Sequence, residues 1–163
     1  MTNKENREVN VNVTPVSLEQ TYGYSKIIVP EGYVPIQSSS PFGGINGPIF
    51  EREDPIGRVW RGFRVAPQHT NQASVVHGGM LMFLADIILG RQAWHDLSAP
   101  AVTVRLSSEF IAQARQGDWV HGFAQTMGMM SANLITMRAK VYCGARLIFA
   151  ANGTFKAIRS KKK

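Results

Sequence analysis

The sequence has one cysteine, no long apolar run and few acidic residues, and each shortage excludes a class of protein. The single Cys143 cannot form an internal disulfide, which agrees with a reducing compartment. No apolar run reaches the ~18 residues of a membrane-spanning helix, because the longest is interrupted by Asp86. Residues 1–30 lack the apolar segment and small-residue cleavage site of a secretory signal. We therefore expect a cytoplasmic protein with no membrane partner.

The 11 acidic residues are outnumbered by 18 Lys and Arg, which gives a formal net charge of +7. A positive excess of this kind can attract nucleic acid, an acidic membrane or a phosphate-rich small molecule. Lys161–Lys163 form a basic tail, and the other positive charges are dispersed singly, unlike the clustered stripe of a nucleic-acid-binding face. We expect no nucleic-acid partner, whereas a phosphate-bearing small molecule would need only a few of these side chains.

A length of 163 residues suits one domain with a sizeable core. Residues 1–45 form a polar lead, and the cluster at 37–48 is so rich in turn residues that we expect no regular structure there. We divide the chain into this lead (1–45), a folded domain (46–158) and a basic C-terminal tail (159–163). The lead is expected to be partly ordered, either without fixed structure or packed as a short helix or clasp.

Two strands are predicted before a central helix and four after it. The first two cover 48–54 and 58–66, with a bulge near Gly62, where the apolar alternation changes phase. Period-two alternation then predicts strands at 101–110, 119–127, 133–142 and 146–158. The last of these is expected to break near Gly153.

Residues 78–95 predict one helix whose apolar side chains point in nearly every direction, which is typical of a helix buried within its fold. One helix among six strands indicates an α+β arrangement in which a curled antiparallel sheet wraps around the helix. Such a sheet covers the helix incompletely. We therefore expect the remaining face to be covered by a second copy of the chain, in a homodimer at least.

A spaced motif lies at the start of this helix and along it: Asn71, His77–Gly79, Leu84–Asp86 and Gly90, followed by the strand AVTVRL from residue 101. This pattern resembles the hot-dog-fold acyl-CoA thioesterases, most of all the branch typified by the phenylacetate-pathway thioesterase (PaaI-type). The resemblance runs from about Pro41 to Ile158. It implies hydrolysis of an acyl-CoA thioester to free acid and coenzyme A.

The chemistry can also be argued from the residues. Thioester hydrolysis needs donors for the oxyanion and a carboxylate that attacks the carbonyl or activates water. Free backbone N–H groups at the helix N-terminus, unobstructed at Gly78 and Gly79, are such donors. Asp86 lies eight residues further on, or ~12 Å along the helix, which is too far for one helix to supply both. Two antiparallel helices from two subunits would remove this conflict, and the resemblance implies such a pair of composite sites per dimer.

By resemblance, Asp86 is the nucleophile or general base and Gly78 the oxyanion-hole donor. Asn71 is the loop amide near the thioester, Thr103 the hydroxyl that orients water, and His77 a residue that holds the loop and helix N-terminus in place. Four of these assignments also have a structural alternative. Asp86 could be a buried acid bonded to a backbone amide, and Gly78 could simply allow a tight turn. Asn71 could be a turn or cap residue, and Thr103 an ordinary strand threonine.

The substrate is expected to lie along Gly79 and the apolar Phe83, with Arg115 and Arg146 as candidates for contacting the coenzyme A phosphates. No cofactor is expected, because coenzyme A belongs to the substrate. No metal is expected either, since His69, His95 and His121 lack the spacing of zinc ligands. A dimer and a dimer of dimers both fit, as do direct and water-mediated attack.

Three alternatives use the same residues differently. The main one is a non-catalytic acyl-CoA-binding or sensing module of the same fold. A hot-dog dehydratase or hydratase would need a catalytic histidine paired with the acid, and the only histidine beside the helix N-terminus is His77, in the HGG position. A serine triad of Ser74, His77 and Asp86 lacks the G-x-S-x-G turn. A packing role is expected for Cys143, whereas Met127, Met129 and Met130 could either fill the core or an interface or line an adaptable acyl pocket.

Overall fold

The computed structural model describes residues 27–37 and 40–158, so the expectations for residues 1–26 and for the tail 159–163 lie outside the described residues. Two α-helices are described, α2 (Pro41–Asn46) and α3 (Gly78–Leu97), with a short 3-10 helix η1 (Pro67–His69) between them. The strands are β1 (Val34–Pro35), β2 (Phe50–Glu53), β3 (Val59–Arg64), β4 (Ala101–Phe110), β5 (Trp119–Ser131), β6 (Leu134–Cys143) and β7 (Arg146–Ala157).

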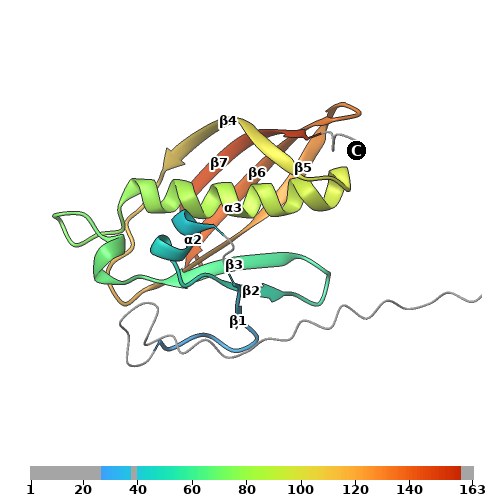
Figure 1. Ribbon diagram of the computed structural model, residues 1–163. Helices are drawn as coiled ribbons and strands as arrows, with labels where there is room; N and C mark the ends of the chain where they lie inside the picture. Colours follow the sequence, from blue (N-terminus) through green and yellow to red (C-terminus); the bar gives the residue numbers. More distant parts are fainter. Residues whose placement is uncertain (1–26, 38–39, 159–163) are drawn as a thin grey trace, which may run out of the picture.

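The strands form one sheet in the order β1-β2-β3-β5-β6-β7-β4, and the neighbouring strands pair antiparallel. The sheet curls around α3, which crosses its concave face (Figure 1). The predicted α+β class and the hot-dog arrangement are confirmed. The chain places β4 at one edge of the sheet and the two-residue β1 at the other.

The core lies between α3 and the sheet. Alternate residues of β6, namely Ile135, Met137, Ala139 and Val141, are at most 1% exposed, as their sequence alternation predicts. The side of α3 that faces the sheet is buried through Met80, Leu81, Leu84, Ala85, Ile88, Leu89 and Ala93. The opposite side is less covered, since Trp94 is 58% exposed. The helix is therefore not enclosed on all sides within one chain.

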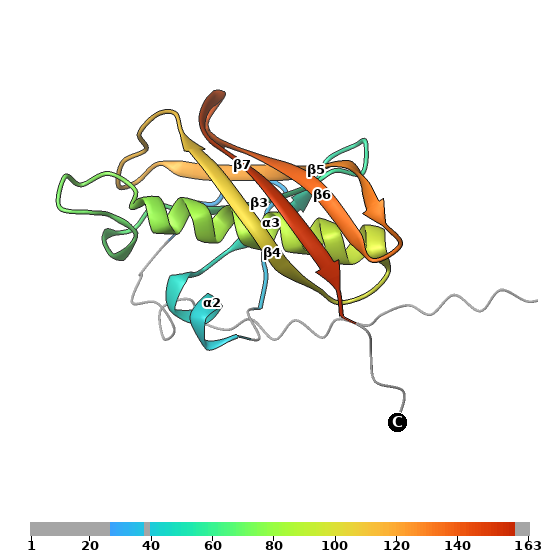
Figure 2. The same ribbon diagram turned by 90° about the horizontal axis from the view of Figure 1, so that it is seen from above.

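The expectation of no regular structure at 37–48 was wrong. Ser40 is the N-cap of α2, because its hydroxyl accepts a hydrogen bond from the Gly43 N–H at 3.0 Å, and Pro41 supplies the helical φ at the first position. Upstream, β1 pairs with β2, so within residues 27–37 and 40–158 the sheet has seven strands rather than six. Figure 2 shows α2 on the side of α3 that faces away from β5 and β6.

Neither glycine irregularity occurs where the sequence predicts it. Gly62 pairs continuously with both β2 and β5, and a Cβ there would meet the Val120 carbonyl oxygen at 2.6 Å. Gly153 lies inside an unbroken β7, where a Cβ would meet the Leu89 side chain at 3.0 Å. Both glycines therefore allow close packing, one against a neighbouring strand and the other against α3.

A bulge does occur in β4, between Thr103 and Arg105. Thr103 pairs with Phe155 and Leu106 pairs with Gly153, so the extra residue Val104 places Thr103 and Leu106 on the same face of the sheet, toward α3. A regular alternation would have put them on opposite faces. The bulge therefore directs the Thr103 hydroxyl toward the helix, and bulges of this kind are common beside active sites.

Candidate active site

A cavity of about 630 Å³ lies along the side of α3 that the sheet leaves uncovered. The helix lines it with Phe83, Asp86, Ile87, Gly90, Arg91 and Trp94. The start of β4 and Phe155 of β7 form one wall of the cavity, and Arg61 of β3 lies in a second wall. Residues between Ile36 and Ile49 cover part of the opening. α2 helps to close it, because Phe42 packs edge-on against Phe83 with ring centroids 5.4 Å apart.

Asp86 and Thr103 meet in this cavity. The Thr103 hydroxyl of the edge strand donates a hydrogen bond of 2.7 Å to Oδ1 of Asp86 in the helix. Asp86 is half-buried, and among the described residues it is the only carboxylate that lines the cavity. A carboxylate accepts several hydrogen bonds, so this contact leaves capacity for a water or a substrate atom. The arrangement suits a base whose position is fixed by a hydroxyl.

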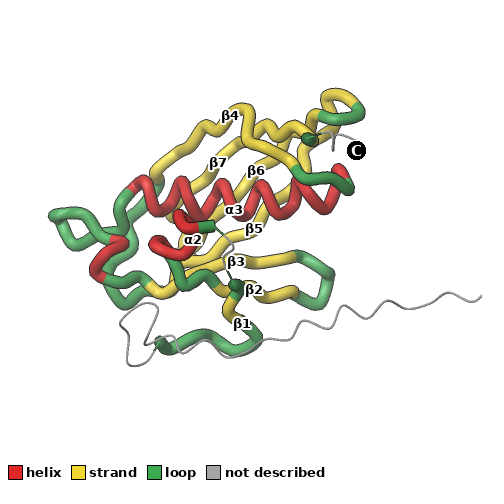
Figure 3. Tube along the Cα trace, viewed as in Figure 1, coloured by secondary structure: helices red, strands yellow, loops and turns green. Residues whose placement is uncertain are grey.

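The N-terminus of α3 lies at the end of the molecule where the loops gather (Figure 3). His77 is its N-cap: Nδ1 accepts from the Gly79 N–H at 2.9 Å, and the His77 carbonyl accepts from the Met80 N–H at 2.9 Å. The His77 N–H in turn donates to the carbonyl of His69 at 2.8 Å. In the part of the chain that the structure describes, the Gly78 N–H has no acceptor, which leaves it open to an oxyanion.

Asn71 occupies the loop beside this N-terminus. Its Oδ1 accepts from the Ala73 N–H at 2.9 Å and more weakly from the Val75 N–H at 3.4 Å. This turn shapes the loop, as the structural explanation of Asn71 requires, and leaves the amide nitrogen as the part that could contact a substrate. The loop is anchored by a bridge between Thr70 and Val76 and by a second between Val75 and Arg115.

One chain does not bring all the predicted site residues together. Asp86, Thr103 and Phe83 line the cavity, whereas Asn71, His77, Gly78 and Gly79 do not. Arg115 and Arg146 lie outside the cavity as well, and Arg146 donates through Nη2 to the Gln113 carbonyl at 2.7 Å. Because Arg115 bridges to Val75, these two arginines belong to the loop end that carries the helix N-terminus.

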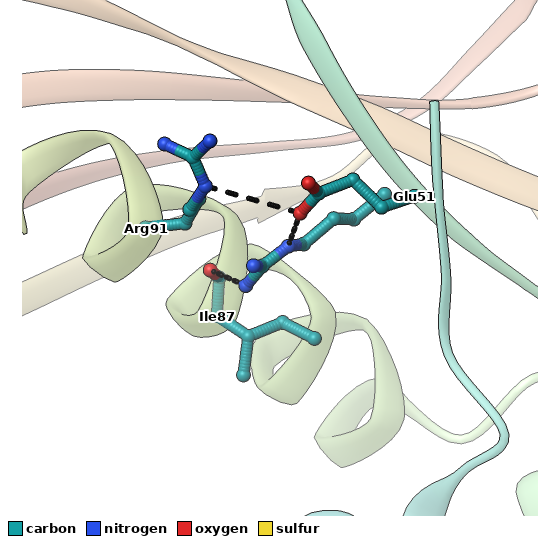
Figure 4. Close-up of polar contacts among 4 residues, drawn as sticks. Glu51, Ile87 and Arg91 are labelled. Atoms are coloured by element: carbon teal, nitrogen blue, oxygen red, sulfur yellow. Dashed lines mark hydrogen bonds and ion pairs between the residues drawn. The ribbon is translucent and has the colours of Figure 1, made fainter. Parts of the chain in front are cut away.

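The sequence reasoning missed a charged cluster on the cavity wall (Figure 4). Glu51 Oε2 accepts from Arg61 Nε at 2.8 Å and lies 3.9 Å from Arg91 Nε, while Arg61 Nη1 donates to the Ile87 carbonyl at 2.8 Å. Burial lowers the pKa of Arg61, and the Glu51 hydrogen bond and charge partly offset that effect. Glu51 and Arg61 face each other across the β2–β3 hairpin, a cross-strand pair that the predicted turn could have revealed.

Within residues 27–37 and 40–158, the His, Cys, Asp and Glu side chains form no group of three that could hold a metal ion. No described helix combines the length and apolar character needed to cross a membrane. Cys143 ends β6 half-buried against the core, where burial raises the pKa of its thiol.

The sequence matches known proteins over most of its length. The family model described as the thioesterase superfamily matches residues 73–147. A candidate esterase from Pseudomonas aeruginosa is 37% identical over 131 residues, which cover 78% of this chain and 96% of that protein. The segment that matches the family model begins two residues after Asn71 and contains the whole of α3 and β4.

Two solved structures share the fold. A Bacillus halodurans protein crystallised with CoA superposes with a TM-score of 0.69 and 21% identity, covering 77% of this chain and 83% of that one. A variant of the phenylacetic acid degradation protein PaaI from Thermus thermophilus has a TM-score of 0.64 and 22% identity, covering 73% of this chain and all of that one, 100%. Both likenesses concern the arrangement of the sheet around its central helix.

Proposed function

Because the chain belongs to the thioesterase superfamily, we propose that it hydrolyses an acyl-CoA thioester to the free acid and coenzyme A. The observation that carries this proposal is the Asp86 carboxylate, held by Thr103 at 2.7 Å within a largely apolar cavity. Such a cavity can hold an acyl group beside a fixed base. The Bacillus halodurans neighbour that was solved with CoA supports the same class of ligand.

The reaction adds water across the thioester. An oxygen joins the carbonyl carbon, the carbon–sulfur bond breaks, and the sulfur leaves as the coenzyme A thiol after taking up a proton. Asp86 serves either as a base that removes a proton from water or as a nucleophile that water later displaces. Thr103 holds Asp86 in position and orients the water in the first of these routes. The Gly78 N–H stabilises the oxyanion that forms on the way.

The oxyanion donor comes from a second subunit in this proposal. Gly78 and Asp86 of one chain are ~12 Å apart along α3, and only Asp86 lines the cavity. The ten-residue β4 forms an edge of the sheet and exposes 47% of Val102 and 58% of Val104. A long edge strand that exposes apolar side chains favours pairing with another strand. We infer that β4 pairs with β4 of a second copy, giving a homodimer or a dimer of dimers with antiparallel α3 helices.

The loop end of one subunit would then lie beside the Asp86 cavity of the other. Asn71, His77 and Gly79 would surround the thioester there, with His77 fixing the helix N-terminus through its cap. Arg115 and Arg146 belong to the same loop end, and in this proposal they contact the phosphates outside the cavity. Their positions fit the proposal that coenzyme A lies on the surface while the acyl group enters the cavity.

An acyl-CoA panel with thiol detection tests the proposal. Aromatic, short and medium acyl-CoAs are supplied to the full chain, and release of free coenzyme A is measured. For the preferred acyl group we expect kcat/KM of ~10⁴ M⁻¹ s⁻¹ or more, the range of ordinary enzymes. The Asp86→Asn variant provides the background. Tight binding of acyl-CoA with no thiol release above that background would instead identify a binding module and overturn the proposal.

A further inference from the structure

The cavity holds more positive than negative charge on the wall formed by β2, β3 and α3. Arg61 and Arg91 both approach one carboxylate, Glu51 (Figure 4). Arg61 is satisfied in this arrangement, because it donates to Glu51 at 2.8 Å and to the Ile87 carbonyl at 2.8 Å. The trio therefore has one net positive charge.

Arg91 has guanidinium donors that no described residue accepts from. Its Nε lies 3.9 Å from Glu51, beyond hydrogen-bond distance, and Figure 4 shows its two Nη atoms directed away from Glu51. No other ion pair or side-chain hydrogen bond of Arg91 is found among the described residues. Its side chain is 35% exposed, against 17% for Arg61, so a ligand within the cavity could reach it.

Asp86 does not neutralise this charge from across the cavity. It lies five residues before Arg91 on α3, which separates the two by ~7.5 Å along the helix and by about 140° around it. Thr103 binds Asp86 on the β4 side of the helix. Arg91 lies near Glu51 on the β2–β3 side. Between the two charged walls, the apolar Phe83, Ile87 and Trp94 line the helix.

We propose that this cavity takes an acyl group whose far end carries an anion, most simply a carboxylate, and that Arg91 binds it. The inference rests on the proposed thioester hydrolysis and names its substrate class: the coenzyme A thioester of a short dicarboxylic acid. The thioester end lies at Asp86, the methylene chain on Ile87 and Gly90 between the two charged residues, and the carboxylate at Arg91. Two Nη donors on one guanidinium match the two oxygens of a carboxylate.

Coenzyme A itself carries phosphates, which are a second possible source of an anion. The place of Arg91 favours the acyl carboxylate, because this side chain lines the same cavity as the catalytic Asp86 and is two-thirds buried. The phosphates are strongly hydrated groups that suit the exposed Arg115 and Arg146 at the loop end. N-acetylcysteamine thioesters, which lack phosphates, separate the two sources.

The experiment compares thioesters of matched chain length, glutaryl against pentanoyl and adipoyl against hexanoyl, each attached to coenzyme A and to N-acetylcysteamine. We expect the unaltered chain to favour the anionic member of each pair. Arg91→Gln should lower kcat/KM for the anionic member by about 10- to 100-fold and leave the neutral member unchanged, because a charge-assisted hydrogen bond is lost. Arg91→Lys should restore part of the preference. Arg58→Gln, which removes a guanidinium stacked on Phe123 outside the cavity, is the matched control and should change neither.

The same Arg91 effect on the N-acetylcysteamine thioesters supports a contact with the acyl carboxylate. An effect that is equal for neutral and anionic coenzyme A thioesters and absent without phosphates would overturn the inference. It is also overturned if both members of each pair are hydrolysed equally and Arg91→Gln does not alter their ratio, while the proposed hydrolysis then stands. If no thioester is cleaved, the proposed function fails, and calorimetric binding of the same pairs to the unaltered and Arg91→Gln chains decides the role of Arg91.

Discussion

Asp86→Asn should lower kcat/KM by about 10²- to 10⁴-fold on every acyl-CoA that the chain hydrolyses, the range that a positioned acid or base contributes. An amide neither accepts a proton from water nor attacks a thioester carbonyl. Its carbonyl oxygen can still accept the Thr103 hydrogen bond, so the contact between α3 and β4 should survive. Thiol release measures the loss, and gel filtration with thermal unfolding shows that assembly and stability are kept.

Asp96→Asn is the matched control for this variant. Asp96 lies in the last turn of the same helix, where it accepts hydrogen bonds from Gln92 and Thr126, and it does not line the cavity. Its replacement removes the same charge from α3 and should leave turnover near that of the unaltered chain. Hydrolysis that survives Asp86→Asn undiminished on all accepted substrates would contradict the assignment of the base.

Val104→Lys should separate the subunits and remove activity with them. Val104 is the bulged residue of the edge strand β4 and is 58% exposed in the single chain. In a symmetric dimer that pairs β4 with β4, the substitution occurs twice in the same interface, and each lysine loses solvent there. We expect the dissociation constant of the dimer to rise at least ~100-fold. Sedimentation at a series of concentrations gives the change, and thiol release should fall as the monomer fraction rises.

Ile56→Lys provides the comparison. Ile56 is 76% exposed in the turn between β2 and β3, near the opposite edge of the sheet, so the same change of residue type there should affect neither assembly nor turnover. A Val104→Lys chain that remains a fully active dimer would show that β4 is not the shared edge.

The sequence predicted the parts of the fold that depend on long periodic patterns. The apolar residues between 80 and 89 indicated α3, and the alternation from Ile135 to Val141 indicated which face of β6 is buried. Each pattern reports burial against a large neighbouring element, and burial of this kind dominates the energy of folding. These elements therefore appeared with nearly correct bounds.

The errors fall where long-range packing overrides the local pattern. Gly62 and Gly153 suggested a bulge and a break, but each allows close contact with residues distant in the sequence. The true bulge at Val104 carries no glycine and is set by the register between β4 and β7. α2 was not predicted because its proline and two glycines suggested a loop, although Ser40 followed by Pro41 is a common helix start.

The candidate site shows the same division. The motif around the helix pointed to Asp86 and Thr103, and in the structure the Thr103 hydroxyl lies 2.7 Å from Oδ1 of Asp86. Arg61 and Arg91 were counted among the singly dispersed positive charges, because their common partner Glu51 is brought to them only by the β2–β3 hairpin and by α3. The contribution of Gly78 depends on a second chain and stays a prediction.

Replacing Gly78 by proline isolates the backbone donor that the composite site requires. Proline removes the N–H at the first helical position, where its φ is favourable, and the extended backbone of His77 suits the residue before a proline. Loss of one oxyanion donor should cost about 10²- to 10³-fold in kcat. Gly78→Ala adds a Cβ against the exposed Phe110 ring but keeps the N–H, so it controls for crowding alone.

Mixing Asp86→Asn subunits with Gly78→Pro subunits then tests whether two chains share each reaction centre. After unfolding and joint refolding, we expect thiol release to recover to about a quarter of that of the unaltered protein. Half of the randomly formed dimers are mixed, and each mixed dimer regains one intact Asp86–Gly78 pair. A mixture that is no more active than its two separate components would contradict the shared site.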